Sequence, residues 1–307
     1  MSFFLVAFLV STIAAATPLL LAAVGELVVE KVGVLNLGVE GMMLSGAIAG
    51  FATAHETGSV GLGVLAAIAA GMAMALLFGV ISLSLQANQT ATGLALTIFG
   101  RGFSALVGAR YVGIPAPTLP KLHLGALSDL PVVGPVLFAQ DPLVYLALVL
   151  LGLVAWGLRS THLGLILRAV GDQHNAAHAL GYPVLGIRYA AVVFGGALAG
   201  LAGGYMSLAY TPMWAQDMTA GRGWVAVALV TFAAWRPFWL LVGAWCFGAL
   251  MYLSLYVQAL GLPVPSALLS ALPYIGTVVV LVLISRDARR IRLHRPAMLG
   301  QPFQTRG

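Results

Sequence analysis

"TGSVGLGVLAAIAAGMAMALLFGVISLSLQANQTATGLALTIFG" (57–100) contains no charged side chain, and the stretch 237–285 contains none either. Because a helix needs roughly 20 apolar residues to cross the hydrocarbon core, each stretch has room for about two spans. The whole chain of 307 residues is 61% hydrophobic and 8% charged, whereas soluble domains carry about a quarter charged residues. The chain is therefore an integral membrane protein, and its continuous apolar runs exclude an alternating β-barrel.

The apolar runs predict an all-α polytopic fold in which residues 1–307 form a single transmembrane domain. Nine spans fit best, with eight or ten as alternatives, because run boundaries are defined only to within a few residues. The runs near 91–108 and 222–240 are short and interrupted by glycine or proline, which predicts broken or re-entrant helices. The nine predicted spans are 3–24, 34–55, 60–86, 91–108, 142–158, 188–209, 222–235, 238–258 and 266–285.

Glycine is abundant, at 37 residues, and recurs at small-residue spacing inside the predicted spans. Gly196 and Gly200 stand four apart and are followed by Gly203 and Gly204. Helices in lipid associate through close backbone approach, which small residues permit. We predict that these glycines are packing positions, with flexibility of moving helices as the alternative.

Basic residues predict the orientation of the chain. "SRDARRIRLHRP" (285–296) holds five of the fifteen Lys and Arg residues and begins a basic tail, 286–307, which the positive-inside rule places in the cytoplasm. Nucleic-acid binding is the disfavoured alternative for this tail. With nine spans, the segment 159–187 is also cytoplasmic, as Arg159 and Arg168 suggest, and the N-terminus lies outside.

Motifs for nucleotide or hydrolytic chemistry are missing from the sequence. The two lysines, Lys31 and Lys121, do not belong to a Walker A motif, and neither HExxH nor GxSxG occurs. His174 and His178 are four apart, but two histidines without a third ligand make a weak metal site. We therefore predict that the chain is not an enzyme, with no catalytic residue, no metal site and no cofactor of its own.

"RAVGDQHNAAHALGYP" (168–183) is the most informative polar stretch. Asp172 is a good N-cap for a short helix, Gly181 fits the C′ position, and Pro183 prevents continuation. An interfacial helix lying on lipid would need a stronger apolar face than the alanines here provide. We favour a helix that docks onto another protein, with the lipid-bound helix as the alternative.

"GVLNLGVEGMML" (33–44) places Asn36 and Glu40 in apolar surroundings and carries three glycines, which predicts a break near the start of the second span. Glu40 has two interpretations. A proton-coupled transporter would need a titrating acid inside the membrane, for which Glu40 and Asp217 are the candidates, with Arg101 and Arg222 as their partners. Alternatively, Glu40 anchors the break by accepting backbone N–H groups or by pairing with a nearby arginine, and we favour this anchor.

The stretches 33–47 and 168–181 resemble permease subunits of ABC importers, in the family of the ribose and branched-chain amino-acid permeases. The Asn-Leu-Gly-Val-Glu-Gly sequence at 36–41 is similar to the form typical of the nucleoside, or simple sugar/nucleoside, branch. "GRGWVAVALVTFAAWRP" (221–237) and "QTATGLALTIFGRG" (89–102) also resemble segments of this family. The resemblance implies a type II-like importer permease fold with broken helices.

It further implies that the segment 159–187 holds a coupling helix, which seats in a groove of the ATP-binding subunit. In the family this segment typically carries Glu-Asn where Asp172 and Gln173 stand here. The residues expected to form the coupling motif are Arg168, Gly171, Asp172, Gln173, His174, Asn175, Ala176, Ala177 and Gly181.

The same resemblance implies the partners and the function. ATP and Mg would be bound by an ATPase with two nucleotide-binding domains; a second homologous permease and an extracytoplasmic lipoprotein receptor would complete the complex. The expected function is import of a nucleoside-type solute across the bacterial cytoplasmic (inner) membrane, with a simple sugar such as ribose as an alternative. Polar residues near breaks are expected to line the path or to bond between helices. These candidates are Asn36, Glu40, Asn88, Gln89, Thr90 and Thr92.

Overall fold

The computed structural model describes residues 2–115, 117–123, 125–260, 265, 268–269, 271–272, 274–276, 279 and 295–303. Throughout these residues the regular elements are helical, as predicted. The α-helices are α1 (Ser2–Lys31), α2 (Val39–Thr57), α3 (Val60–Gly79), α4 (Gln89–Gly108), α5 (Pro142–Ser160), α6 (His162–Asp172), α7 (His174–Ala179), α8 (Val184–Tyr205), α9 (Arg222–Phe232) and α10 (Pro237–Ala259). Five-residue π-helical turns extend α3 to Ser84 and α8 to Tyr210.

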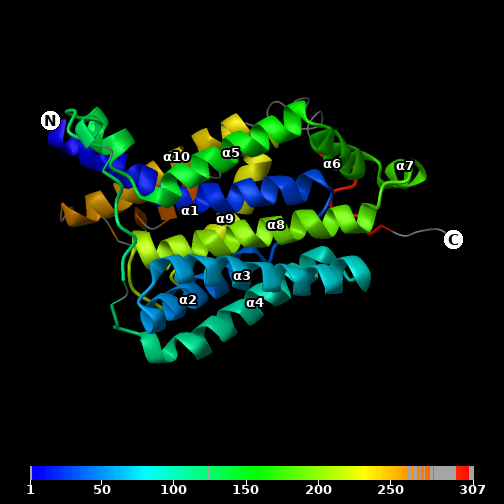
Figure 1. The fold of residues 1–307 in the computed structure, drawn as a ribbon, viewed down its shortest axis with the longest axis horizontal. Coiled ribbons are helices and arrows are strands. Elements are labelled where there is room, and N and C mark those ends of the chain that lie inside the picture. Colours follow the sequence, from blue (N-terminus) through cyan, green and yellow to red (C-terminus); the bar gives the residue numbers. More distant parts are fainter. Residues whose placement is uncertain are drawn as a thin grey trace.

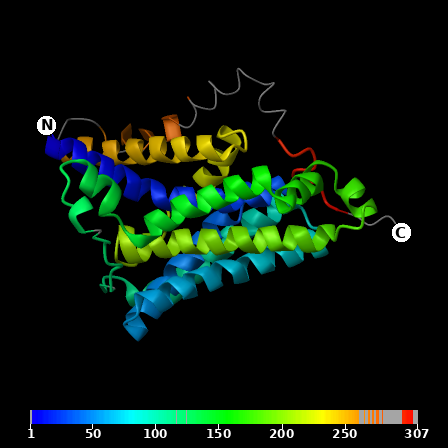
Figure 2. The same cartoon turned by 45° about the horizontal axis from the view of Figure 1, so that its top comes forward.

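The long helices run side by side along the longest axis of the molecule (Figure 1). Helix α8 lies at the centre of the bundle and packs against α1, α2 and α3. The view in Figure 2 separates α1 and α10 on one side from α2, α3 and α4 on the other. The short helices α6 and α7 lie at the end of the bundle opposite the N-terminus, and residues 295–303 lie beside them.

Among the described residues, six helices are long and apolar enough to cross a membrane. Helix α9 is shorter, and α2 does not meet the same criteria of length and composition. The predicted count of nine is therefore not confirmed; most of the predicted span 266–285, and residues 286–294 and 304–307 of the predicted basic tail, lie outside the described residues. The six candidate spans are Phe4–Lys31, Val60–Ser84, Gln89–Tyr111, Pro142–Ser160, Val184–Tyr210 and Pro237–Ala259.

Of the two apolar runs that were predicted to be broken, one is interrupted in the structure and the other is not. The run 222–240 is interrupted, because α9 ends at Phe232 and α10 begins at Pro237. The run 91–108 is instead one continuous helix, α4, so that prediction was wrong. Its glycines do not break α4; Gly93 and Gly100 let it approach the chain at Leu37 and Gly41.

Glycines bring α8 into backbone contact with its neighbours, as predicted. A Cβ atom placed on Gly200 would lie 2.9 Å from the Cα atom of Gly71 in α3. A Cβ atom on Gly46 of α2 would lie 2.5 Å from the Cα atom of Gly200. Neither approach leaves room for a side chain, so the glycines decide how closely α2, α3 and α8 pack.

The predicted break in the 33–44 stretch is the connection between α1 and α2. Gly33 has a φ of +83°, which favours glycine, and the chain stays non-helical until Val39. The Asn36 side chain accepts a hydrogen bond from the Gly38 N–H (2.9 Å), and the Asn36 N–H donates to the Glu26 carboxylate (3.3 Å). These two bonds hold the connection, and Gly41 lies inside α2 without interrupting it.

Candidate functional site

The Glu40 carboxylate joins the first turns of α2 and α9. It accepts hydrogen bonds from the Thr219 hydroxyl (2.5 Å), the Gly221 N–H (2.8 Å) and the Gly223 N–H (2.6 Å). The first N–H groups of a helix have no partner within the helix, and a carboxylate satisfies them well. Gly223 permits the approach, because a Cβ atom there would lie 2.5 Å from the Glu40 N. These are contacts of the kind that the anchor interpretation expects.

Arg101 of α4 does not pair with Glu40 but with Asp217. Its Nε and Nη2 atoms donate to the two oxygens of Asp217, at 2.6 and 2.7 Å. This bidentate geometry gives directional binding as well as charge pairing. The hydrogen bonds from Arg101 hold the pKa of the Asp217 carboxyl below its usual range. The pair therefore links α4 to the loop that precedes α9, beside the Glu40 junction.

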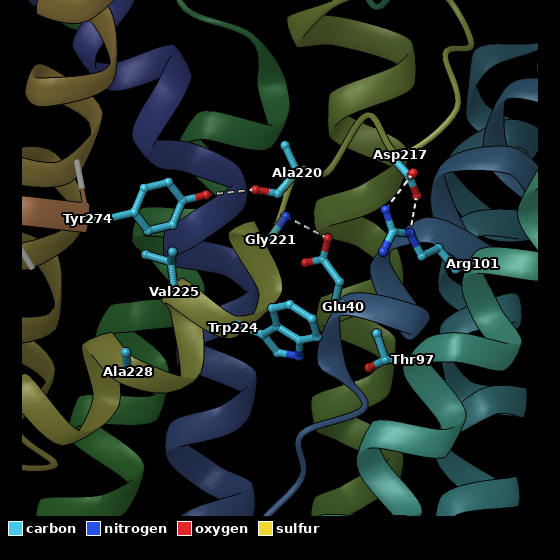
Figure 3. A pocket seen from close by; sticks show the side chains of 10 residues that line it. All are labelled: Glu40, Thr97, Arg101, Asp217, Ala220, Gly221, Trp224, Val225, Ala228 and Tyr274. Carbon is cyan, nitrogen blue, oxygen red and sulfur yellow. Dashed lines mark hydrogen bonds and ion pairs between the residues drawn. The ribbon is translucent and has the colours of Figure 1, made fainter. Parts of the chain in front are cut away.

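A cavity of about 470 Å³ opens at this junction (Figure 3). That volume lies within the range of small-molecule sites. Two aromatic side chains are well exposed there, Trp224 at 44% and Tyr274 at 50%. The indole N–H of Trp224 donates to the Leu37 carbonyl (3.3 Å), and the Tyr274 hydroxyl donates to the Ala220 carbonyl (3.1 Å). The lining residues are Glu40, Thr97, Arg101, Asp217, Ala220, Gly221, Trp224, Val225, Ala228 and Tyr274.

The arrangement offers a solute three kinds of contact. Trp224 and Tyr274 present flat aromatic surface, while Arg101 and Asp217 present a cation and a carboxylate. Such a mixture suits an uncharged polar solute with a flat or partly apolar body. Among the described residues no group of three or more His, Cys, Asp or Glu side chains could hold a metal ion.

Of the six predicted path residues, only Glu40 lines this cavity. Gln89 is buried and accepts a hydrogen bond from the Leu35 N–H (2.8 Å), which ties the start of α4 to the α1–α2 connection. Asn88 caps α4 by accepting from the Ala91 N–H (3.0 Å). Asn36 and Thr92 are buried, and Thr90 is exposed. Whether any of them meets the solute stays a prediction.

The prediction missed the aromatic part of the cavity. Trp224 lies in the 221–237 stretch that was singled out for its resemblance, so a tryptophan beside a glycine pair was the signal available there. Asp217 was considered only as a proton carrier, and Arg101 only as its or Glu40's partner. Arg101 and Asp217 are 116 residues apart, so the sequence alone does not decide with which acid Arg101 pairs.

At the far end of the bundle, α7 occupies the predicted coupling segment. The prediction that Asp172 is an N-cap was wrong: α6 continues through Asp172, and Gln173 separates α6 from α7. The C-terminal prediction is confirmed, since Gly181 has a φ of +88° and its N–H donates to the His178 carbonyl (2.9 Å). The Tyr182 N–H donates to the Ala177 carbonyl, which completes a typical helix stop.

The residues of the coupling motif fall into two groups. Gly171, His174 and Ala177 are buried against the bundle. Burial, followed by the nearby Arg188 charge, lowers the pKa of His174 below its usual range. The exposed members are Arg168, Asp172, Gln173, Asn175, Ala176 and Gly181. Leu180, at the C-terminal cap of α7, is 77% exposed and extends this outer face.

The structure combines a bundle of apolar helices, an interrupted span, a cavity where α2 and α9 begin and a capped helix at one end. This combination is typical of a multi-pass membrane transport subunit. The chain belongs to the family described as the branched-chain amino acid transport system permease component, whose profile matches residues 8–284. Membership of this family identifies a multi-pass membrane permease and supports a transport role rather than an enzymatic one.

Three curated relatives match over most of the chain. A putative glucose ABC transporter permease protein of Haloferax volcanii is 41% identical and covers 95% of this chain and 96% of its own length. The guanosine ABC transporter permease protein of Bacillus subtilis is 30% identical, over 88% of this chain and 89% of its own. A nucleoside ABC transporter permease protein of Lactococcus lactis is 28% identical, over 87% and 88%. No solved structure shows significant similarity to this chain.

Proposed function

We propose that this chain is the permease subunit of an ATP-driven ABC importer and forms part of the translocation path for a nucleoside-type solute. The observation that carries the proposal is the cavity at the junction of α2, α4 and α9, where Trp224 is exposed beside the Arg101–Asp217 pair. Discontinuous helices whose first turns meet at a polar site are typical of solute sites in transporters. The chain needs no nucleotide site of its own, because a partner ATPase binds ATP and Mg.

The nucleoside assignment has two supports. The 36–41 motif has the nucleoside-branch form, and two of the curated relatives are named for guanosine and nucleosides. An exposed indole provides a stacking surface for a base, which is worth about 1–3 kcal/mol per base in other sites. A sugar is the second candidate, favoured by the 41% identical relative named as a putative glucose permease.

Uptake by the complete complex in proteoliposomes tests both parts of this proposal. We expect ATP-dependent uptake of labelled nucleosides to exceed that of glucose and ribose. Trp224→Ala should lower nucleoside uptake on the order of tenfold, while Trp224→Phe retains most of it. Trp156→Ala is the matched control, because Trp156 is an exposed tryptophan of α5 outside the cavity.

Two outcomes would contradict the proposal in different ways. Uptake that needs no ATP and follows a proton gradient would identify a secondary transporter. ATP-driven uptake of glucose or ribose in preference to every nucleoside would keep the ABC mechanism and replace the solute.

The outer face of α7 is the proposed docking surface for the ATPase. Leu180→Asp should weaken binding of the ATPase subunit by about 2 kcal/mol, roughly thirtyfold, because it replaces the large exposed apolar side chain of this face by a charge. Binding of purified ATPase to the permease in nanodiscs measures this. Leu127→Asp is the control, since Leu127 is an exposed leucine in the 109–141 loop. Unchanged ATPase binding would favour the alternative in which this helix rests on lipid.

The proposed importer also contains the other subunits that the family resemblance implies. The ATPase carries two nucleotide-binding domains, a second homologous permease pairs with this chain, and an extracytoplasmic lipoprotein delivers the solute. The chain lies in the cytoplasmic membrane, with α7 and the C-terminus on the cytoplasmic side. Co-purification of a tagged chain from its native membrane tests the composition, and recovery of this chain with only copies of itself would overturn the heterodimer.

A further inference from the structure

Residues 298–303 lie across the α7 end of the bundle, where Figure 1 shows them in red. We call them the C-terminal clasp. The Met298 N–H donates to the Gly171 carbonyl (2.9 Å), and the Gly300 N–H donates to the Gly33 carbonyl (3.0 Å). Gly171 belongs to the end of α6 and Gly33 to the α1–α2 connection. The clasp therefore bonds to two segments that are far apart in the sequence.

Arg188, in the first turns of α8, binds the same parts from inside. Its side chain is fully buried and uses three nitrogen atoms. Nε donates to the Val32 carbonyl (3.2 Å), Nη1 to the Gln301 carbonyl (3.0 Å), and Nη2 lies 3.1 Å from Nδ1 of His174. A buried guanidinium is costly unless its donors are satisfied. Arg188 thus fixes the relative positions of α7, the clasp and the end of α1.

The Phe303 ring completes the contact with α7. It lies edge-on to the rings of His174 and His178, with centroids 5.3 and 5.4 Å away. The Phe303 carbonyl accepts a hydrogen bond from Gln86, just after α3 (3.4 Å). His174 and His178, whose spacing suggested at most a weak metal site, share one aromatic partner.

The α1–α2 connection leads directly to the cavity. Leu37 lies only four residues after Gly33, and its carbonyl accepts hydrogen bonds from Thr97 (3.0 Å) and Trp224 (3.3 Å). Both donors line the cavity. A continuous series of contacts therefore runs from α7 through Arg188 to the connection, and from the connection to the cavity. A series of contacts transmits movement when the positions of its two ends, here α7 and the cavity lining, depend on each other.

We propose that Arg188 and the C-terminal clasp are positioning elements that fasten the coupling helix α7 to the α1–α2 connection, so that displacement of α7 by the ATPase also displaces the cavity lining. The inference rests on the proposed ABC function. The clasp stays attached to α7 during transport and moves with it.

Loss of these contacts should uncouple ATP hydrolysis from transport, so that ATP is hydrolysed without solute being moved. In the complete complex, Arg188→Gln and Phe303→Ala should lower solute transported per ATP hydrolysed on the order of tenfold, while the ATPase still co-purifies and hydrolyses ATP. Phe303→Tyr keeps the ring and should keep most of the ratio. Phe238→Ala is a control at an exposed aromatic residue of α10. An unchanged ratio in both Arg188→Gln and Phe303→Ala would overturn the proposal.

Cross-linking tests the clasp even if those variants do not assemble. In a Cys246→Ser background, which removes the single native cysteine, His178→Cys with Phe303→Cys should form a disulfide in membranes. His55→Cys with Phe303→Cys should not, because α3 spans the bundle between the two ends. Because the reduced protein lacks the Phe303 ring, the locked pair should transport at least as much solute per ATP as the same protein after reduction. If the His178→Cys and Phe303→Cys pair does not form a disulfide, the clasp does not contact α7. If the locked protein transports only after reduction, the clasp does not move with α7. Either result would overturn the proposal.

Failure of the proposed function gives a different result. If the wild-type complex shows no ATP-driven uptake, the function is wrong whatever the disulfide does. If the wild-type complex transports with ATP but the variants transport equally well per ATP, only the clasp inference fails.

Discussion

Replacing Glu40 by glutamine is expected to destabilise the folded chain by about 3 kcal/mol, because hydrogen bonds to a charged group are worth about 1.5–3 kcal/mol and an unsatisfied buried donor costs a further penalty. Glu40 uses one carboxylate oxygen for Thr219 and Gly221 and the other for Gly223. A glutamine has one acceptor oxygen, so its NH₂ group would face either the Gly223 N–H or the other two donors. Denaturant unfolding in detergent and the yield of monodisperse protein measure the effect.

Glu56→Gln is the matched control for Glu40→Gln. Glu56 lies at the exposed end of the same helix and accepts a hydrogen bond from a single donor, the Tyr111 hydroxyl (2.9 Å). We expect it to change stability by less than about 1 kcal/mol, as exposed substitutions usually do. If Glu40→Gln instead folds like the wild type and alters only the pH dependence of uptake, Glu40 carries protons and the anchor interpretation is wrong.

Glu40 shows what the sequence could predict and what it could not. A carboxylate between two apolar segments, next to Asn36 and three glycines, was enough to predict a break that needs backbone N–H donors. The donors themselves, Gly221 and Gly223, lie about 180 residues away and could not be chosen from periodicity. The local sequence thus indicates that Glu40 needs hydrogen-bond donors. Which residues donate depends on how helices distant in the sequence pack together.

Asp172 failed as a predicted N-cap for the same reason. Capping preference is a weak local effect of about 1 kcal/mol, and here tertiary contacts decide where α6 ends. Gly171 lies against the Lys31 carbonyl, its own carbonyl accepts a hydrogen bond from the Met298 N–H, and α6 ends at Asp172. Since Met298 lies 127 residues after Gly171, the sequence around 168–183 contains no trace of this contact.

Replacing Gly200 by leucine is expected to cost roughly 3 kcal/mol or more and to prevent close packing of α8 with α3. The Gly200 Cβ position lies 2.9 Å from the Cα of Gly71, and it also clashes with the Ala67 carbonyl. These obstacles are backbone atoms of a continuous helix, so they cannot rotate away as a flexible side chain would. Helices α3 and α8 would have to separate, and the bundle would lose this contact. Thermal unfolding of purified protein in detergent measures the loss.

Gly152→Leu provides the matched control, because Gly152 lies in the membrane-spanning helix α5 and has no atom within 4 Å of its Cβ position. There leucine improves helix propensity by roughly 0.8 kcal/mol and meets no obstacle, so stability should stay equal or rise. The two substitutions are chemically identical and differ only in what surrounds the glycine. Equal stability of Gly200→Leu and Gly152→Leu would therefore show that backbone contact between α3 and α8 does not hold the bundle together. A loss of stability in Gly200→Leu but not in Gly152→Leu would show that this contact stabilises the bundle.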